Sequence, residues 1–113
     1  MMFRLTRHSV NQICKKISYL SSDRDLCFKN LRFDDCTILN KLLLSTLHLK
    51  YITFDECTFD FKEELKKPPK TVMHHDAIYF SYPDFWGNTE TFITKWFDQT
   101  SASGYKIEIS YEE

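Results

Sequence analysis

Apolar residues recur at helical spacing in several parts of the chain. The first stripe predicts a helix over Val10–Leu20, with Ser9 as its N-cap. A nearly buried helix is predicted after Thr37, from Ile38, Leu39, Leu42, Leu43, Leu44 and Leu47. Another is predicted from Phe92, Ile93, Trp96 and Phe97. A poorer helical pattern follows Thr58, through Phe59, Phe61 and Leu65, and must end before Pro68.

Short segments of alternating apolar residues separate these helices. They predict strands at Leu31–Phe33, at Ile52–Phe54, within Thr71–Tyr82 and at Tyr105–Tyr111. The stretches Asp84–Asn88 and Ser101–Gly104 are predicted to be loops or turns. Strands that alternate with helices favour parallel pairing through right-handed crossovers, so the pattern predicts an α/β fold.

Two segments of the chain are similar to each other. Asn30–Leu39 and Tyr51–Asp60 align without gaps, their numbers differing by 21 (51 − 30), and both contain Phe-Asp-x-Cys-Thr. The wider frame, Phe28-x-x-Leu31-x-Phe33-x-x-Cys36-x-Ile38, matches the leucine-rich-repeat pattern L-x-x-L-x-L-x-x-N/C-x-L. Weaker copies start at His75 and Lys106, where the strand offsets become 26 (78 − 52) and 29 (107 − 78). The alignment predicts that the side chains of Cys36 and Cys57 lie about one strand spacing (~4.8 Å) apart.

The repeats predict a single domain over residues 1–113, a small leucine-rich-repeat-like strand–helix solenoid. About four short parallel strands would carry helices on one side. Residues 9–20 would form an N-terminal capping helix, and residues 26–109 the repeat-like region. The alternative is a set of unrelated amphipathic strands in an α+β domain.

Composition limits the possible function classes. The chain has 113 residues, with 42% hydrophobic and 16% aromatic content, as in one globular domain. Its net charge of −1 provides no overall electrostatic attraction to nucleic acid or to an anionic membrane. No apolar run approaches the ~20 residues that a membrane span requires. The cysteines contain no C-x-x-C pair and follow no signal-peptide pattern: Cys14, Cys27, Cys36 and Cys57. We therefore expect reduced, buried thiols in an intracellular protein of the cytoplasm or nucleus.

A C-terminal motif resembles a known family. Phe92-Ile93-Thr94-Lys95-Trp96-Phe97 is followed by Gln99–Gly104 and then by apolar Ile107 and Ile109. This order resembles the second large type of the F-box-associated domain of nematode F-box proteins, in which a late helix carries Phe-Leu-x-x-Trp-Ile and a strand follows a small-residue turn. The resemblance spans Leu26 to Ile109. Asn88-Thr89-Glu90 departs from the Asp-Leu-Asn that usually precedes the Phe.

The resemblance implies the substrate-recognition region of an F-box ubiquitin-ligase subunit. An F-box is an N-terminal helical module that docks the adaptor of a cullin-type ligase, and Met1–Leu20 is too short for one. The chain is then either a fragment of a longer protein or a divergent member that lacks the ligase contact. Ligase subunits are expected as partners only through an F-box missing from this chain. The alternative is a stand-alone leucine-rich-repeat-like binding or structural protein with no ligase link.

Catalytic and metal chemistry find little support in the sequence. His74 and His75 are adjacent, so on a strand they point to opposite faces, and a surface or strand-edge role is expected. The cysteines lie in or beside apolar faces, which raises the pKa of a thiol and lowers its reactivity. The acidic pairs Asp34-Asp35 and Asp55-Glu56 are expected to be solvated turn residues. We expect no enzyme activity, cofactor or metal; a small hydrolase or metal enzyme is the third hypothesis.

In a repeat sheet, the residues that flank the inward pair of each strand line one continuous face. That face mixes Tyr, Arg, Thr and acids, and Tyr and Arg are frequent binding hot spots. The candidate partner-binding residues are Arg32, Tyr51, Thr53, Tyr79, Trp86, Lys106 and Glu108. Two interpretations stay open: a recognition surface for an unknown protein, or an ordinary solvated sheet. Trp86 lies in a loop and is either a core plug or an exposed anchor.

Overall fold

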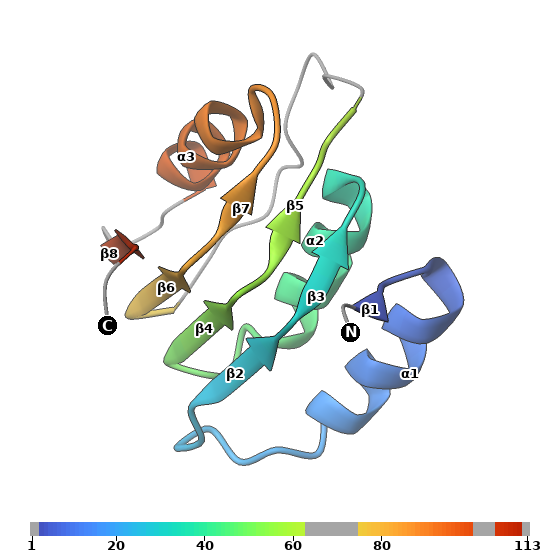
Figure 1. The fold of residues 1–113 in the computed structure, drawn as a ribbon. Helices are drawn as coiled ribbons and strands as arrows, with labels where there is room; N and C mark the ends of the chain where they lie inside the picture. Colours follow the sequence, from blue (N-terminus) through green and yellow to red (C-terminus); the bar gives the residue numbers. More distant parts are fainter. Residues whose placement is uncertain (1–2, 63–74, 101–105, 112–113) are drawn as a thin grey trace.

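Short strands and helices alternate along the chain (Figure 1). The computed structural model describes residues 3–62, 75–100 and 106–111. Within these ranges the elements are β1 (Phe3–Arg4), α1 (Arg7–Ile17), β2 (Leu26–Lys29), β3 (Leu31–Phe33), α2 (Cys36–Ser45), β4 (Tyr51–Asp55), β5 (Thr58–Phe59), β6 (Ala77–Ser81), β7 (Asp84–Phe85), α3 (Thr89–Thr100) and β8 (Lys106–Ser110). Figure 1 shows α2 behind the strands, with α1 and α3 beside the first and last of them.

The strands form two parallel sheets, in the orders β1-β3-β5-β7 and β2-β4-β6-β8. The chain passes from the second sheet to the first through a residue in the left-handed region: Asn30 (φ 56°), Glu56 (54°) and Tyr82 (48°). The N–H groups of these residues donate to carbonyls of the neighbouring strand, at Asp55 (3.0 Å), Ser81 (2.8 Å) and Ser110 (2.7 Å) respectively. The turns thus continue the hydrogen-bond ladder, and its bonds offset the cost of positive φ.

The predicted α/β class and the parallel pairing are confirmed. The predicted strands appear as β3, β4, β6 and β8. The two later strand offsets match the observed registers, since Ile52 lies opposite Ile78 and Ile78 lies opposite Ile107. The sequence did not predict β1, β2, β5 and β7. Three of them, β1, β5 and β7, have only two residues, too few to give a periodic signal.

The alignment of Asn30–Leu39 with Tyr51–Asp60 is wrong. Phe28 lies opposite Phe54, and Phe54 lies opposite Phe80. Partners on neighbouring strands are therefore 26 residues apart in the sequence at each step (54 − 28 and 80 − 54). Leu31–Phe33 pairs with β1 and β5 rather than with Ile52–Phe54. The two strands on either side of each turn have similar alternating patterns. The alignment therefore matched β3, the strand after one turn, to β4, the strand before the next turn.

The proposed equivalence of Cys36 and Cys57 fails for the same reason. Cys36 is the first residue of α2, whereas Cys57 lies between β4 and β5. Thr58, predicted to cap a helix, instead begins β5. Phe59 also lies in β5, and Phe61 follows it in a non-helical segment, so the predicted helix is wrong up to residue 62. Its remainder from residue 63 onwards, and the predicted turn at Ser101–Gly104, lie outside the described residues. The predicted loop at Asp84–Asn88 contains β7.

Stacked phenylalanine rings form the centre of the core. One stack runs along each sheet: Phe28, Phe54 and Phe80 at centroid distances of 5.4 and 5.3 Å, and Phe33, Phe59 and Phe85 at 5.2 and 5.3 Å. Edge-to-face contacts join the stacks, as where Phe54 meets Phe33 and Phe59 at 84° and 80°. Such pairs each contribute about 0.5–1.5 kcal/mol beyond the burial of area. The stacks therefore hold the two sheets together.

Both N-terminal helices begin earlier than predicted. Thr6, not Ser9, caps α1: the Thr6 hydroxyl accepts from the Ser9 N–H, and the Ser9 hydroxyl accepts from the Thr6 N–H. Asp35, not Thr37, caps α2 by accepting from Ile38 N–H (3.0 Å). Each boundary offers two residues of capping type within one turn, so the pattern alone does not fix it. The helix predicted over residues 9–20 is thus α1, which packs beside α2, while β1 forms the sheet edge.

His75 is fully buried, contrary to the surface role expected for it. Its Nε2 lies 3.0 Å from Thr46 Oγ1, and the Thr46 hydroxyl donates to the carbonyl of Leu43 (2.8 Å). Since that hydroxyl has one proton, Nε2 is the donor in the histidine contact. The pair joins the end of α2 to the start of β6. His74 lies outside the described residues.

Candidate partner-binding surfaces

Four predicted binding residues lie together on one sheet. Thr53, Tyr79 and Glu108 are directly opposite one another on β4, β6 and β8. Tyr51 lies two residues before Thr53, and its side chain is 38% exposed. Alternate residues of a strand share a side, so these four side chains lie away from the buried phenylalanine stack. We call this surface the sheet face. Lys106 pairs with Ala77 at the same level as Tyr51, but its side chain lies outside the described part.

The sheet face continues onto β2, which the sequence did not predict. Cys27 lies opposite Thr53 and is exposed, and Lys29 lies opposite Asp55. The Lys29 ammonium is 3.8 Å from the Asp55 carboxylate, and the lysine side chain is 63% exposed. Tyrosine, threonine and charges of both signs therefore share one side of the sheet. Such a surface can form hydrogen bonds with a protein partner and has no single predominant sign of electrostatic potential.

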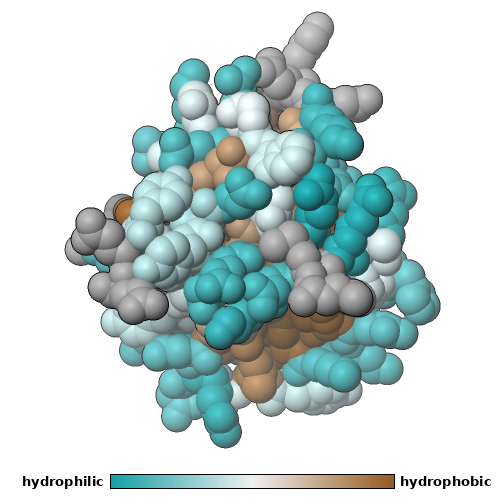
Figure 2. Space-filling view, viewed as in Figure 1, coloured by the Kyte–Doolittle hydropathy of each residue, from teal (hydrophilic) through white to brown (hydrophobic). Residues whose placement is uncertain are grey.

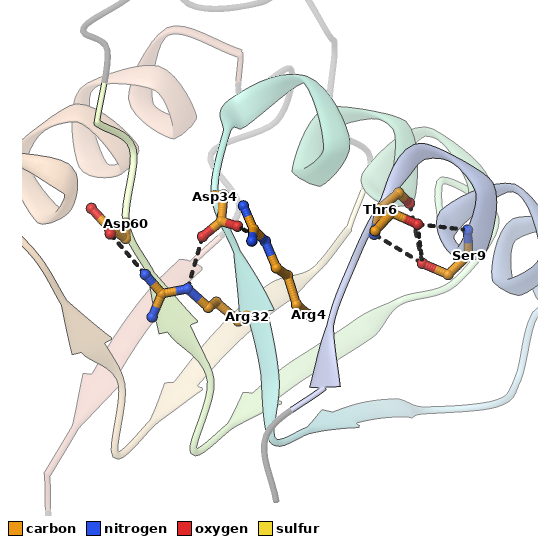
Figure 3. Close-up of polar contacts among 6 residues, drawn as sticks. All are labelled: Arg4, Thr6, Ser9, Arg32, Asp34 and Asp60. Carbon is orange, nitrogen blue, oxygen red and sulfur yellow. Dashed lines mark hydrogen bonds and ion pairs between the residues drawn. The ribbon is translucent and has the colours of Figure 1, made fainter.

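Arg32 does not belong to the sheet face. It lies on β3 in the other sheet, opposite Arg4 and Thr58. Figure 3 shows its guanidinium between two carboxylates: Nε donates to Asp34 and Nη2 donates to Asp60, both at 2.8 Å. Asp34 also pairs with Arg4. The Asp60 side chain is only 8% exposed, so Arg32 neutralises a carboxylate with little access to water.

Trp86 is exposed and is not a core plug. Half of it (51%) is accessible to solvent. Its indole N–H donates to Asp84 (2.8 Å), and the Arg32 guanidinium carbon lies 5.3 Å from the centre of its ring. That distance is within the range of a cation–π contact, so Arg32 holds the ring in place. Arg32 and Trp86, predicted separately, thus belong to one cluster away from the sheet face.

A small pocket opens beside Trp86, and the sequence analysis did not predict it. Its volume is ≈ 240 Å³, and it is lined by Asp60, Phe61, Lys62, Trp86, Gly87, Asn88, Thr89 and Phe92. The pocket forms where the chain after β5 meets the start of α3: Phe61 N–H donates to Thr89 Oγ1 (3.1 Å). The only local signal in the sequence is the turn at Gly87, whose φ is 58°. Cofactor and drug-sized sites span roughly 300–1,000 Å³, so this pocket suits one side chain of a partner.

Most of the side of the molecule seen in Figure 1 is hydrophilic. Figure 2 shows its most extensive hydrophobic area in the lower part of this view, between β2 and α1, and smaller apolar groups elsewhere. Both elements carry partly buried apolar side chains, among them Ile13 and Leu26. Single areas of this kind are common on protein surfaces and do not by themselves define a site.

All four cysteines are free thiols, but their environments differ. Burial raises the pKa of both Cys36 and Cys57 to about 11, and the negative charges of Asp35 and Asp55 add to the effect. Burial, followed by the charge of Asp55, also raises the pKa of Cys27, although this residue is exposed. The prediction that all the cysteines are buried is therefore wrong for Cys27, and Cys14 is only partly buried.

These environments predict selective labelling. In the native protein at pH 7.5, we expect iodoacetamide to modify Cys27 before Cys36 and Cys57, whose labelling should be slower by about a hundredfold or more than that of an unfolded thiol. Both buried thiols should be labelled in denaturant, which serves as the control. Because folding raises the pKa of both buried thiols, their protonated form contributes fully to the stability of the fold at pH values below about 9. This contribution is lost as the pH rises towards about 11. Peptide mass spectrometry after timed quenching measures the rates; rapid native labelling of Cys57 would contradict the packing.

In residues 3–62, 75–100 and 106–111, no group of three or more His, Cys, Asp or Glu side chains is arranged to hold a metal ion. Over the same ranges, no helix has the length and apolar character required to cross a bilayer.

The fold and surfaces define a class: an α/β protein with two parallel sheets and a partly exposed sheet face of mixed polarity. Comparison of the chain with protein-family models, curated proteins and solved structures finds no match.

Proposed function

We propose that the chain is a protein-interaction module that binds its partner through the sheet face. The observation that carries the proposal is the register that brings Thr53, Tyr79 and Glu108 side by side, next to the exposed ring of Tyr51. Tyrosine supplies contact area at low cost in conformational entropy, and Thr and Glu supply hydrogen bonds. The module acts without enzyme activity or a cofactor of its own.

We further propose that the architecture is a leucine-rich-repeat-like solenoid, in which each unit runs from one ring of the Phe28, Phe54 and Phe80 stack to the next. The equal offsets of 26 (54 − 28 and 80 − 54) support this unit in place of the shorter one. The same unit is supported by the residues with positive φ that follow β2, β4 and β6, namely Asn30, Glu56 and Tyr82. Each unit would contribute one ring to each aromatic stack, so that neighbouring units bury a continuous core.

The partner class follows from the resemblance to the F-box-associated domain. In this proposal the module selects substrates for a ubiquitin ligase. The motif residues Ile93, Trp96 and Phe97 lie on α3 and are buried, which fits a motif that specifies a core. The alternative is a stand-alone repeat protein with no ligase link. It is favoured by the regular register of Phe28, Phe54 and Phe80, which requires no F-box.

The proposal is tested by affinity capture from cells of the source organism, followed by quantitative mass spectrometry. The Tyr51→Glu, Tyr79→Glu variant should lose a protein that the wild type captures, because two carboxylates replace two contact rings. Tyr19→Glu is the matched control, since Tyr19 lies outside the sheet face and is 81% exposed. Circular dichroism confirms that each bait is folded.

Three outcomes of the capture are informative. Cullin-ligase subunits enriched with the partner support substrate selection for a ligase. A partner without ligase subunits favours the stand-alone protein. Identical protein sets on all three baits would contradict the sheet face as a binding surface.

A further inference from the structure

A second surface lies at the end of the β6 and β8 strands and was not among the predicted sites as a unit. Its aromatic side chains are exposed: Tyr82 (38%), Trp86 (51%) and Tyr111 (57%). Two acidic residues, Asp84 and Glu90, lie among them. We call these five residues the aromatic–acidic patch.

Hydrogen bonds bring the members of the patch together. Tyr82 N–H donates to the carbonyl of Ser110 (2.7 Å), which places Tyr82 beside Tyr111, the residue after the end of β8. The Tyr111 hydroxyl donates to a Glu90 carboxylate oxygen (3.4 Å). Trp86 donates to Asp84, and the charges of both Asp84 and Glu90 help to raise the pKa of Tyr111, after the effect of burial. The two carboxylates therefore act on the same small region.

The patch has a net negative charge. Within the described ranges, neither Asp84 nor Glu90 forms an ion pair. The guanidinium that contacts Trp86, that of Arg32, is already neutralised by Asp34 and Asp60 at 2.8 Å. Lys62 lines the pocket beside Trp86 and partly opposes the negative charge of the patch.

Exposed aromatic rings beside carboxylates form a recognisable chemical environment. Ring faces attract cations, and guanidinium groups stack on tryptophan more often than ammonium groups do. The Arg32 contact at 5.3 Å shows that the Trp86 ring accepts a guanidinium in this structure, and the exposed part of the ring remains open to another. Carboxylates close to that ring would pair with the same cation and exclude an acidic partner.

We propose that the aromatic–acidic patch binds an arginine- or lysine-rich segment of a partner protein. The inference goes beyond the proposed function, because the patch is separate from the sheet face and its charge selects a basic partner. An arginine of the segment would lie on the exposed part of Trp86, and Asp84 and Glu90 would provide its counter-charges. The pocket beside Trp86 is large enough for one neighbouring side chain.

The test uses a blocked hexa-arginine peptide as the probe and a blocked hexa-glutamate peptide as the opposite-charge control. The chain has two tryptophans, so the nitrogen–proton NMR spectrum contains two indole signals, and Trp86→Phe assigns them. We expect hexa-arginine at low salt to shift the Trp86 signal and to leave the signal of buried Trp96 in place. The affinity should fall as the salt concentration rises.

Charge-neutral variants decide whether the patch is the site. Asp84→Asn with Glu90→Gln should weaken hexa-arginine binding by on the order of tenfold, since two nearby counter-charges are lost. Asp23→Asn with Asp25→Asn removes the same charge from an exposed loop, and should change the affinity less than about twofold. Lys62→Gln should strengthen binding. A Trp86 signal that does not move, one that moves with hexa-glutamate, or equal losses in the patch and loop variants would each overturn the proposal. None of these outcomes depends on the sheet face.

Discussion

Phe54→Ala is expected to lower the free energy of unfolding by about 3–5 kcal/mol, as is typical when a large buried aromatic is truncated. Phe54 is fully buried and contacts four other phenylalanine rings, two within its own stack and two across the core. Its removal therefore leaves a cavity where the two stacks meet. A loss of this size is a large fraction of the stability of a small domain.

Urea unfolding followed by circular dichroism measures the effect of Phe54→Ala. Phe85→Ala is the matched control, because Phe85 is half-buried at the end of its stack on an edge strand. We expect it to cost less than half as much as Phe54→Ala, since less area is lost and water can fill the space. Equal losses for the two variants would contradict the central place of Phe54 in the core.

Arg32→Leu is expected to destabilise the protein by about 3 kcal/mol, because it leaves a nearly buried carboxylate without a counter-charge. The Asp60 side chain is 8% exposed and Asp34 is 18% exposed, and both receive hydrogen bonds from the same guanidinium. The variant also removes the cation from the Trp86 ring. Asp34 still pairs with Arg4, so the cost lies in the unpaired Asp60 carboxylate rather than in the loss of a favourable pair.

A double-mutant cycle separates the cost of leaving Asp60 unpaired from the loss of its favourable pairing with Arg32. Arg32→Leu combined with Asp60→Leu should recover much of the lost stability, since the buried charge is removed with its partner. Lys29→Leu is the surface control: Lys29 is 63% exposed and 3.8 Å from Asp55, so its loss should cost less than about 1 kcal/mol. If the double variant is less stable than the sum of the single variants predicts, Asp60 has another role.

Much of the fold could be predicted from the sequence, because amphipathic helices and strands leave a periodic signal. The leucine face of α2, the Phe92–Phe97 stripe of α3 and the alternation in β4 and β8 are of this kind. The register could not be predicted in the same way. Leu26-x-Phe28 and Leu31-x-Phe33 have the same pattern on successive strands, so the shared Phe-Asp-x-Cys-Thr motif gave a plausible but incorrect frame.

The candidate site was predicted in part. Tyr51, Thr53, Tyr79 and Glu108 belong to strands that the alternation predicts, so their shared face could be found from that pattern alone. Arg32 was grouped with them through the incorrect frame, and it lies in the other sheet. The aromatic–acidic patch depends on residues brought together by turns, such as Tyr82 beside Tyr111, which the sequence order does not reveal.

The most direct test of the sheet face as a partner-binding surface is photo-crosslinking at single positions. Tyr51→p-benzoylphenylalanine retains an aromatic ring at an exposed position, and Tyr19→p-benzoylphenylalanine is the control at an exposed position after the end of α1. After illumination in cells of the source organism, the Tyr51 variant should form a crosslink to one protein, identified by mass spectrometry, that the Tyr19 variant does not form. If the Tyr19 variant crosslinks to the same protein with equal yield, or the Tyr51 variant crosslinks to none, the sheet face is not the recognition surface.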